Sequence, residues 1–226
     1  MIDLEQAEAM DLIRRRFEAR TQFLARIGDV DPERVLFPAG NPGLNAGEWP
    51  AFRQSWREVR RGHNLLVVSD GLTDPYPDDL GAGVGFEVGV EVRGEPRRLS
   101  TARRNADRFR WATQAAMELA QFAAANASVM LDAVDRNGGL TVHASGEGLP
   151  PYAYMDDGSC VLLVWRRPDL PYELNLGGVR ASLLSGTLLL PPEHATIRTY
   201  GKRAAVAIMQ GLSDGVSDPD RRLISV

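Results

Sequence analysis

The sequence predicts a mixed α+β protein, in which a central sheet is packed by an N-terminal helix and by a long central helix. Two long amphipathic stretches and several short strand-like runs carry this prediction. Residues 3–27 form the first stretch, with Asp3 as a candidate N-cap and Gly28 as a candidate stop. Its apolar face is expected to hold Leu4, Ala7, Met10, Ile13, Phe17 and Leu24, and its polar faces Arg14, Arg15, Arg16, Glu18 and Arg20.

The second helix is expected over residues 109–134, where frequent alanines add helix propensity and Asn137-Gly138-Gly139 gives a stop signal. Residues 29–62 carry so many prolines and glycines that we expect an irregular covering segment there. Its best helical candidate is Pro50–Val59, because Phe52, Trp56 and Val59 fall at helical spacing.

Strands are expected where apolar residues run together or alternate. Asn64–Ser69 is a continuous apolar run, which predicts a buried strand. Phe86–Val92 alternates apolar residues with Glu87, Gly89 and Glu91, which predicts a strand with one solvent-exposed face. The two strands together suggest a hairpin with a long loop. The C-terminal third predicts strands over residues 161–165, 172–176 and 182–190. Residues 192–200 are ambiguous, and residues 202–210 favour a closing helix without excluding a strand.

Composition narrows the class of protein. The 226 residues fit one domain over 1–226, and the net charge of −4 disfavours nucleic acid as a partner. Cys160 is the only cysteine, which excludes an intrachain disulfide and suits a reducing, cytoplasmic location. No apolar run approaches the roughly 18 residues of a membrane span, so no membrane partner is expected.

The densest polar cluster is the loop Asp70–Asp79, which has four carboxylates. Several oxygen ligands could hold a divalent cation, and a small metal-dependent hydrolase using Asp70, Asp74, Asp78 and one histidine is therefore an alternative. The competing interpretation is a turn, because Asp, Gly and Pro are common turn residues, and we expect no metal and no cofactor.

Other catalytic patterns are weaker. His63, His143 and His194 show no zinc spacing, Cys160 suits a buried thiol, and nothing local supports a Cys160–His143 nucleophile pair. The glycines Gly81, Gly83 and Gly85 lead into a strand and not into a helix, so they do not form a phosphate loop.

Two sequence blocks resemble the Suppressor-of-fused-like family. Val-Ser-Asp-Gly-Leu-Thr-Asp-Pro (68–75) precedes Gly-Val-Gly-Phe-Glu-Val-Gly-Val-Glu-Val (83–92), a tryptophan then leads into a helix, and Gly-Glu-Gly-Leu-Pro (146–150) follows that helix. The resemblance covers roughly residues 60–200 and is weak after Pro171. The motif residues, which turn and packing chemistry alone can explain, are Gly71, Leu72, Pro75, Gly85, Phe86, Glu87 and Trp111.

The resemblance implies an α/β sandwich-like domain that binds a protein and catalyses nothing. Animal members restrain a transcription factor, and bacterial members look like immunity proteins that neutralise a toxin, which suits a chain without the extra domain of the animal members. We expect Asp70, Asp74, Asp78 and Asp79 to contact a basic partner. A homodimeric regulatory subunit is a third possibility besides the hydrolase.

Overall fold

An eight-stranded mixed sheet organises the part of the chain that the computed structural model describes, residues 4–36, 54–76, 83–94, 102–171, 173–212 and 214–226. The strands are β1 (Asp29–Leu36), β2 (Trp56–Arg61), β3 (Asn64–Ser69), β4 (Phe86–Arg93), β5 (Gly139–Ser145), β6 (Ser159–Trp165), β7 (Glu173–Asn175) and β8 (Arg180–Leu189). The helices are α1 (Leu4–Ile27), α2 (Ala102–Ala125), α3 (Ala127–Asn137), α4 (Pro191–Tyr200) and α5 (Lys202–Gly211), with one turn of 3-10 helix at Pro151–Ala153. The α+β class is confirmed.

The strand order is β1-β2-β3-β4-β8-β6-β5, and β7 pairs separately with β8. Strands β4 and β8 run parallel, and every other pairing between the described strands is antiparallel. The long connection between β4 and β8 contains α2, α3 and the β5–β6 pair. The predicted antiparallel pairing of residues 64–69 with residues 86–92 is confirmed.

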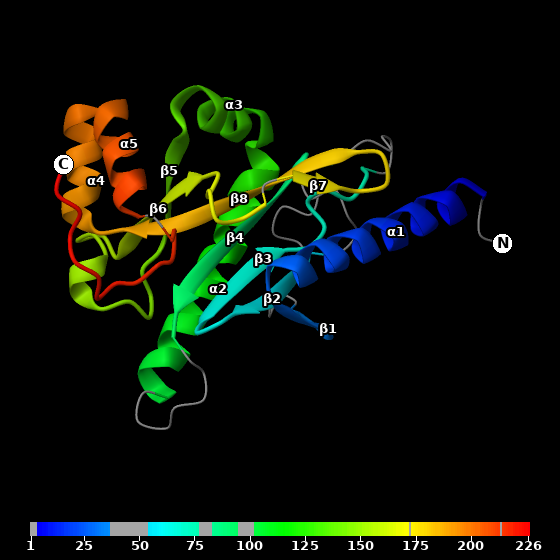
Figure 1. Cartoon of the computed structure of the whole chain (residues 1–226), viewed down its shortest axis with the longest axis horizontal. Coiled ribbons are helices and arrows are strands. Elements are labelled where there is room, and N and C mark those ends of the chain that lie inside the picture. Colours follow the sequence, from blue (N-terminus) through cyan, green and yellow to red (C-terminus); the bar gives the residue numbers. More distant parts are fainter. Residues whose placement is uncertain (1–3, 37–53, 77–82, 95–101, 172, 213) are drawn as a thin grey trace.

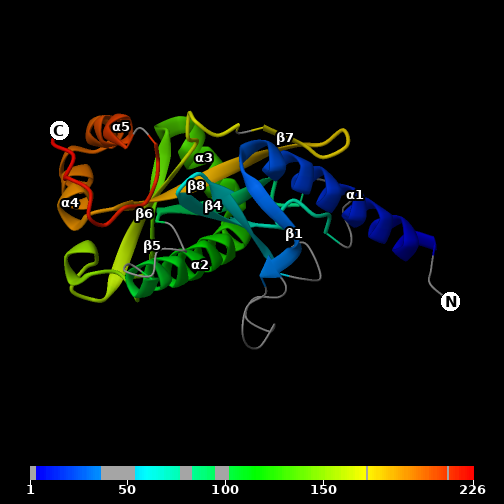
Figure 2. The ribbon, with the colours of Figure 1, turned by 60° about the horizontal axis from the view of Figure 1, so that its bottom comes forward.

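Helices cover both faces of the sheet (Figures 1 and 2). On one face, α2 and α3 pack against a core that includes Phe86, Val88, Val90 and Leu184. The opposite face carries two separate apolar clusters, one beneath α1 and one beneath α5. Figure 1 shows α1 and the α4–α5 pair at opposite ends of the sheet, so this face has a gap in its apolar cover between them.

The N-terminal helix is confirmed, but its buried face differs from the predicted one. Arg16, Arg20, Phe23 and Leu24 are buried, whereas Met10 is exposed. Both views show the first turns of α1 extending beyond the strands (Figures 1 and 2). The arginines are buried because they meet carboxylates of the sheet, which the periodicity of the helix alone does not reveal.

Three secondary-structure predictions were wrong. The Pro50–Val59 helix is contradicted from Trp56 onward, where every residue of β2 pairs with β3, and residues 50–53 lie outside the described residues. The expected irregular segment contains β1. The single helix over 109–134 is two helices, because the chain breaks at Asn126, whose side-chain amide donates to the Phe122 carbonyl at 3.0 Å.

Strand β5 had no predicted counterpart, although Leu140, Val142 and Ala144 alternate with polar residues as half-buried strands do. The ambiguous segment 192–200 is helix α4, and residues 202–210 are helical, as favoured. Glycine ends α3 as predicted, since Gly138 adopts φ 82° and donates its N–H to the Val134 carbonyl.

Candidate functional site

Strand β4 turns two glutamates toward the face covered by α1, while its apolar residues face α2. The alternation of this strand was predicted, but its second face is not wet: Glu87 and Glu91 are both buried. Each carboxylate is met by arginines from other elements, Glu87 at 3.8 Å from Arg20 and Glu91 at 2.5 Å from Arg61. Ionised carboxylates are buried only when paired and hydrogen-bonded, which explains both arginine clusters.

The motif turn wraps around the Glu87 carboxylate. The backbone N–H groups of Gly71 and Thr73 donate to Glu87 Oε1 at 3.2 and 3.1 Å, and the Thr73 hydroxyl donates to the same oxygen at 2.7 Å. The Ser69 hydroxyl donates to Oε2 at 2.6 Å. Gly71 sits at φ 134°, which only glycine adopts readily, so the turn can present successive N–H groups to one carboxylate.

Arg20 of α1 binds the two aspartates of this turn, and we call the group of Arg20, Asp70, Asp74 and Glu87 the Arg20 cluster. Its Nε lies 2.6 Å from Asp70 Oδ1 and its Nη1 lies 2.6 Å from Asp74 Oδ1. Arg16 donates to the Thr73 carbonyl at 2.9 Å, and Arg57 lies 3.6 Å from Asp70. The cluster therefore fastens α1 to the turn through charge-assisted hydrogen bonds, which are stronger than neutral ones.

Burial sets the protonation energetics of the Arg20 cluster. Burial raises the pKa of Glu87 and of Asp74, and the nearby Arg20 guanidinium only partly reverses both shifts. Burial also lowers the pKa of Arg20, but Asp70, Glu87 and Asp74 outweigh it and hold the pKa above the ordinary value. Arg20 thus keeps its charge, and that charge opposes the rise in the pKa of Asp74 and of Glu87.

The acidic loop is not an open acidic surface where the structure describes it. Asp70 and Asp74 are each 1% exposed and paired with Arg20, so neither is available to a partner in this fold. Asp78 and Asp79 lie outside the described residues. A contact role for the loop remains a prediction, and for the two buried residues it would require the Arg20 cluster to open.

The remaining motif residues position this turn and its strand. Gly85 adopts φ 88° at the start of β4, Leu72 and Phe86 are fully buried in the α2-side core, and Pro75 is buried. Trp111 lies within α2, and its indole N–H donates to the Ser145 carbonyl at 3.1 Å. Leu72, Pro75, Phe86 and Trp111 are therefore buried, and the architectural role of the motif remains a prediction.

Neither catalytic alternative, the metal-dependent hydrolase or the Cys160–His143 pair, has an assembled site among the described residues. No group of three or more His, Cys, Asp or Glu side chains in the described ranges is placed to hold a metal ion. Cys160 is buried, and burial raises the pKa of its thiol to about 11. Because Cys160 pairs with Ala144 while His143 pairs with Val161, the thiol and the imidazole project from opposite faces of the sheet.

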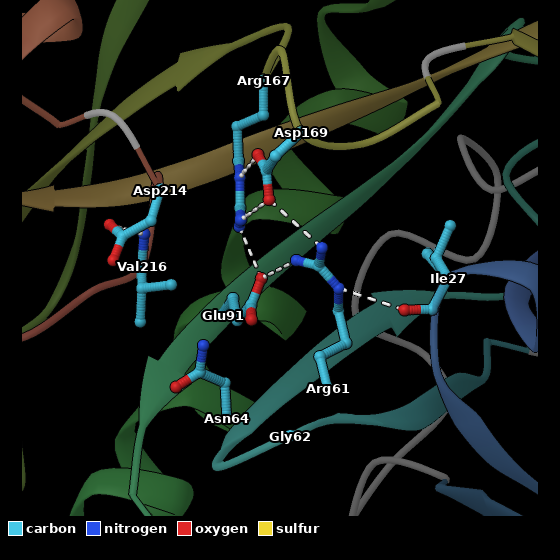
Figure 3. A pocket seen from close by; sticks show the side chains of 9 residues that line it. All are labelled: Ile27, Arg61, Gly62, Asn64, Glu91, Arg167, Asp169, Asp214 and Val216. Atoms are coloured by element: carbon cyan, nitrogen blue, oxygen red, sulfur yellow. Dashed lines mark hydrogen bonds and ion pairs between the residues drawn. The ribbon is translucent and has the colours of Figure 1, made fainter.

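Glu91, Arg61, Arg167 and Asp169 pair with one another and line an open pocket of about 320 Å³ on the α1 side of the sheet (Figure 3). Its walls come from the end of α1, the β2–β3 turn, β4, the segment after β6 and the C-terminal segment. The lining residues are Ile27, Arg61, Gly62, Asn64, Glu91, Arg167, Asp169, Asp214 and Val216. Unlike the Arg20 cluster, this group includes carboxylates that solvent reaches, since Asp169 is 33% and Asp214 is 54% exposed, whereas Glu91 and Arg167 are buried.

Two arginines share Glu91 and Asp169 in this pocket, whereas Asp214 pairs with Arg93 at 2.6 Å. Arg61 Nη1 and Arg167 Nη1 lie 2.5 and 2.6 Å from the same oxygen, Glu91 Oε2. Asp169 accepts from Arg167 at 2.9 and 2.6 Å and from Arg61 at 3.1 Å. Partial burial raises the pKa of Asp169, but the hydrogen bonds from Arg167 and Arg61 outweigh it and leave the pKa below the ordinary value.

Comparison with known proteins addresses the fold. The chain is similar to a chain in the crystal structure of the Sufu-Fu complex, with a TM-score of 0.50 and 15% sequence identity over 92% of this chain and 89% of that chain. The fold is Sufu-like. No family model matches the sequence, and no curated protein matches it. The Sufu-like fold thus extends well beyond residues 60–200, where the sequence resemblance lies.

Within the Sufu-like fold, sequence reasoning missed the arginines and Glu91. Arg16 and Arg20 were assigned to polar faces of α1, although their four-residue spacing with Leu24 places all three on one stripe. That spacing is the signal in the sequence that could have indicated that both arginines lie on the buried side of α1. Glu91 alternates with Glu87 on β4, but its partners Arg61 and Arg167 are far away in sequence, so no local pattern indicates the pocket.

Proposed function

We propose that this chain is a non-enzymatic protein-binding domain, acting as one unit over residues 1–226 on another protein and not on a nucleic acid or a membrane. Its Sufu-like fold carries the proposal, since 92% of the chain aligns with a chain solved as part of a protein complex. The similarity concerns the fold, and a fold alone does not determine a function. Among the described helices, none combines the length and the apolar character required to cross a bilayer.

The disposition of the acidic residues supports binding over catalysis. Carboxylates with raised pKa values in a cleft open to solvent would favour an enzyme. Here the carboxylates with raised pKa values, Asp74 and Glu87, are closed off beneath α1 and paired with or near Arg20. The hydrolase interpretation of the Asp70–Asp79 loop therefore has no supporting geometry in the described part of that loop.

A more specific form of the proposal is an immunity-type role, in which the domain neutralises a toxin in the cytoplasm by direct binding. The family resemblance at residues 68–75 and 83–92 motivates this role. An inhibitor needs a stable scaffold and a complementary surface, and the buried ionic clusters of this fold would hold such a scaffold in one arrangement.

The proposal is tested in two stages. The full chain is first used to capture proteins from its host, and each candidate is purified and mixed with the chain for light scattering and calorimetry. A stoichiometric binary complex is expected. If no purified candidate forms a complex, and metal-supplemented chain hydrolyses a test ester or phosphodiester, protein binding is the wrong class.

The immunity role is tested by co-expression with the product of the neighbouring gene. The wild-type chain should restore growth if that product is a toxin. Arg20→Met, which removes the buried cation, should lose the rescue with the fold, whereas Arg14→Met changes only an exposed arginine of the same helix and should retain it. Growth arrest that the wild-type chain does not relieve would reject this role.

A further inference from the structure

Helices α4 and α5 present a positively charged face to solvent. Their exposed charged residues are Arg198, Lys202 and Arg203, all within six positions around the turn that joins the two helices. The only carboxylate of these helices, Glu193, is 2% exposed and paired with Arg221. Figures 1 and 2 show both helices at the end of the sheet away from α1. Because the whole chain has a net charge of −4, this face has the opposite sign to the protein that carries it.

The fold does not neutralise this face. The guanidinium groups of Arg198 and Arg203 have no ion-pair partner within the part of the chain that the structure describes. Lys202 Nζ donates to the Arg136 carbonyl at 2.6 Å, which places it beside the end of α3. The two aspartates of α3 are paired with other arginines, so they do not balance these charges.

Helix stability accounts for only part of the charge. A cation stabilises the C-terminal end of a helix and is unfavourable at the N-terminal end. Arg198 lies in the last turn of α4, and Lys202 binds a carbonyl at the end of α3, so both support a helix end. Arg203 lies in the first turn of α5, which contains no acidic residue. The dipole of α5 therefore opposes Arg203, and its position is not explained by the stability of that helix.

Exposed apolar side chains lie among these cations. Tyr200, at the end of α4, is 69% exposed, and Val206 of α5 is 38% exposed. Val206 follows Lys202 by four positions and Arg203 by three, so the three side chains share one face of α5. Tyrosine and arginine are among the residue types that contribute most to protein interfaces. The combination favours a binding surface over a helix face that only water covers.

The charge of this surface fits an acidic segment of a protein. An arginine guanidinium can bind a carboxylate through two parallel hydrogen bonds, and both unpaired arginines are free to do so. An apolar residue between two carboxylates could pack on Tyr200, whose ring is exposed. A nucleic acid fits less well, because the negative charge of the rest of the chain repels a phosphate backbone that extends past these few cations.

We infer that α4 and α5 bind an acidic segment of the partner protein, with Arg198 and Arg203 pairing with its carboxylates and Tyr200 packing against an apolar residue between them. The inference rests on the proposed protein-binding function and names the chemistry of the partner. The partner segment has the opposite charge to the one expected for the Asp70–Asp79 loop, so the two surfaces are tested separately.

The first test uses the peptide acetyl-Asp-Glu-Leu-Asp-Glu-amide as the acidic probe. Its Asn/Gln counterpart is the neutral control, and a single-stranded DNA pentamer is an anion of the same charge. The full chain is titrated with each, and its backbone amide resonances are followed by NMR. The acidic peptide should shift the resonances of residues 198–206 in a saturable manner, more weakly at high salt, and the neutral peptide should not.

Three results of this titration would overturn the inference. The first is the absence of a saturable shift with the acidic peptide. The second is a set of shifts spread over exposed arginines elsewhere, such as Arg180, because that pattern means non-specific attraction. The third is tighter binding of the DNA pentamer at the same residues, because the surface would then suit a nucleic acid.

Variants assign the contacts. Arg203→Gln should weaken binding of the acidic peptide by about 2- to 5-fold, as expected for an exposed charge pair. Tyr200→Ala should weaken it by about 5-fold, as expected for an aromatic contact. Arg180→Gln is the matched control, since Arg180 is an exposed arginine at the end of β8 that lies away from α4, and it should have no effect. Thermal melting checks that each variant folds, and equal binding by Arg203→Gln and Arg180→Gln would contradict the inference.

The same variants separate this inference from the proposed function. Once a partner is purified, Arg203→Gln should weaken the complex, and neutralising one acidic segment of the partner should remove the difference between wild type and variant. A partner that binds both forms equally leaves the protein-binding function intact and rejects this surface as its contact. If no purified candidate forms a complex, the protein-binding function fails, and the peptide titration alone decides whether the surface binds acidic segments.

Discussion

Replacing Arg20 with methionine should destabilise the fold strongly and in a pH-dependent manner. Arg20 lies within 2.6 Å of both Asp70 and Asp74 and 3.8 Å from Glu87, and all four side chains are buried. Removing one partner of a buried ion pair costs about 3–5 kcal/mol, because the remaining charges stay buried without compensation. For a chain of this length, that loss corresponds to a fall in melting temperature of roughly 6–20 °C.

The pH dependence follows from the carboxyl groups that Arg20 leaves behind. The folded-state pKa values of Asp74 and Glu87 are already raised by burial, and the variant raises them further because it removes a cation that lowers them. A group with a raised folded-state pKa binds its proton more tightly in the folded chain, so stability is regained as the pH falls through that pKa. Each further unit of increase in a folded-state pKa adds about 1.4 kcal/mol to the destabilisation at neutral pH. The cost of Arg20→Met should therefore be smaller at pH 5 than at pH 7.

Urea denaturation of wild type and variant at the two pH values measures this effect through the transition midpoint and slope. Arg14→Met is the control, since Arg14 lies on the same helix with a side chain 62% exposed and pairs only with exposed acids. The control should leave the midpoint nearly unchanged. The reasoning is refuted if Arg20→Met behaves like the control, or if its cost is the same at both pH values.

Three further predictions concern packing and the buried thiol. Gly28→Ala should lower the free energy of unfolding by about 1–3 kcal/mol, because its Cβ would lie 2.5 Å from the Arg60 carbonyl oxygen; an unchanged urea midpoint would contradict this. Cys160, buried and with its thiol pKa raised to about 11, should react with an aromatic disulfide reagent at pH 8 only as fast as the chain unfolds, and immediate labelling of the native protein would reject its burial. Trp111→Phe replaces the buried indole with a smaller phenyl ring and removes the N–H bond to the Ser145 carbonyl, so it should cost at least about 1–2 kcal/mol in the same denaturation assay, and a neutral result would contradict the contribution of this side chain.

The elements that the sequence predicts well are those whose pattern is local. Helix α1 and the alanine-rich α2 repeat apolar residues over many turns, and β4 alternates Phe86, Val88, Val90 and Val92 against α2. Such patterns need no knowledge of distant partners. The split at Asn126 escaped prediction because α3 continues the apolar stripe of α2 across the break, so that the pattern reads as one helix.

The elements that escaped prediction depend on distant segments. In β2, the spacing of Trp56 and Val59 fits one face of a helix, but in the strand the two side chains lie on opposite faces of the sheet, Trp56 in the α2-side core and Val59 beneath α1. Arg20 is bonded to Asp70, which is 50 positions later in the chain. A charged residue on a helix is ordinarily solvated, and nothing within α1 signals that carboxylates lie opposite it.

The candidate site was predictable only in part. Glu87 belongs to a motif that the sequence assigns to a turn and a strand. In the structure its carboxylate accepts hydrogen bonds from the backbone N–H groups of Gly71 and Thr73 in that turn. The pocket around Glu91 was not predictable, because its walls come from segments spread from Ile27 to Val216. Convergence of this kind is a property of the tertiary fold, which one sequence without the fold does not display.

The two glutamates of β4 also determine how this strand aligns with its neighbours. Its α2-facing side repeats valine at positions 88, 90 and 92, so sliding the strand by two residues would keep that side apolar. The opposite side does not repeat, because Gly89 separates Glu87 from Glu91. A slide of two residues would move Glu87 away from the N–H groups that surround it and carry Glu91 away from Arg61 and Arg167. The buried charges of Glu87 and Glu91 add little net stability, but they disfavour a two-residue shift of β4 that the valines alone would permit.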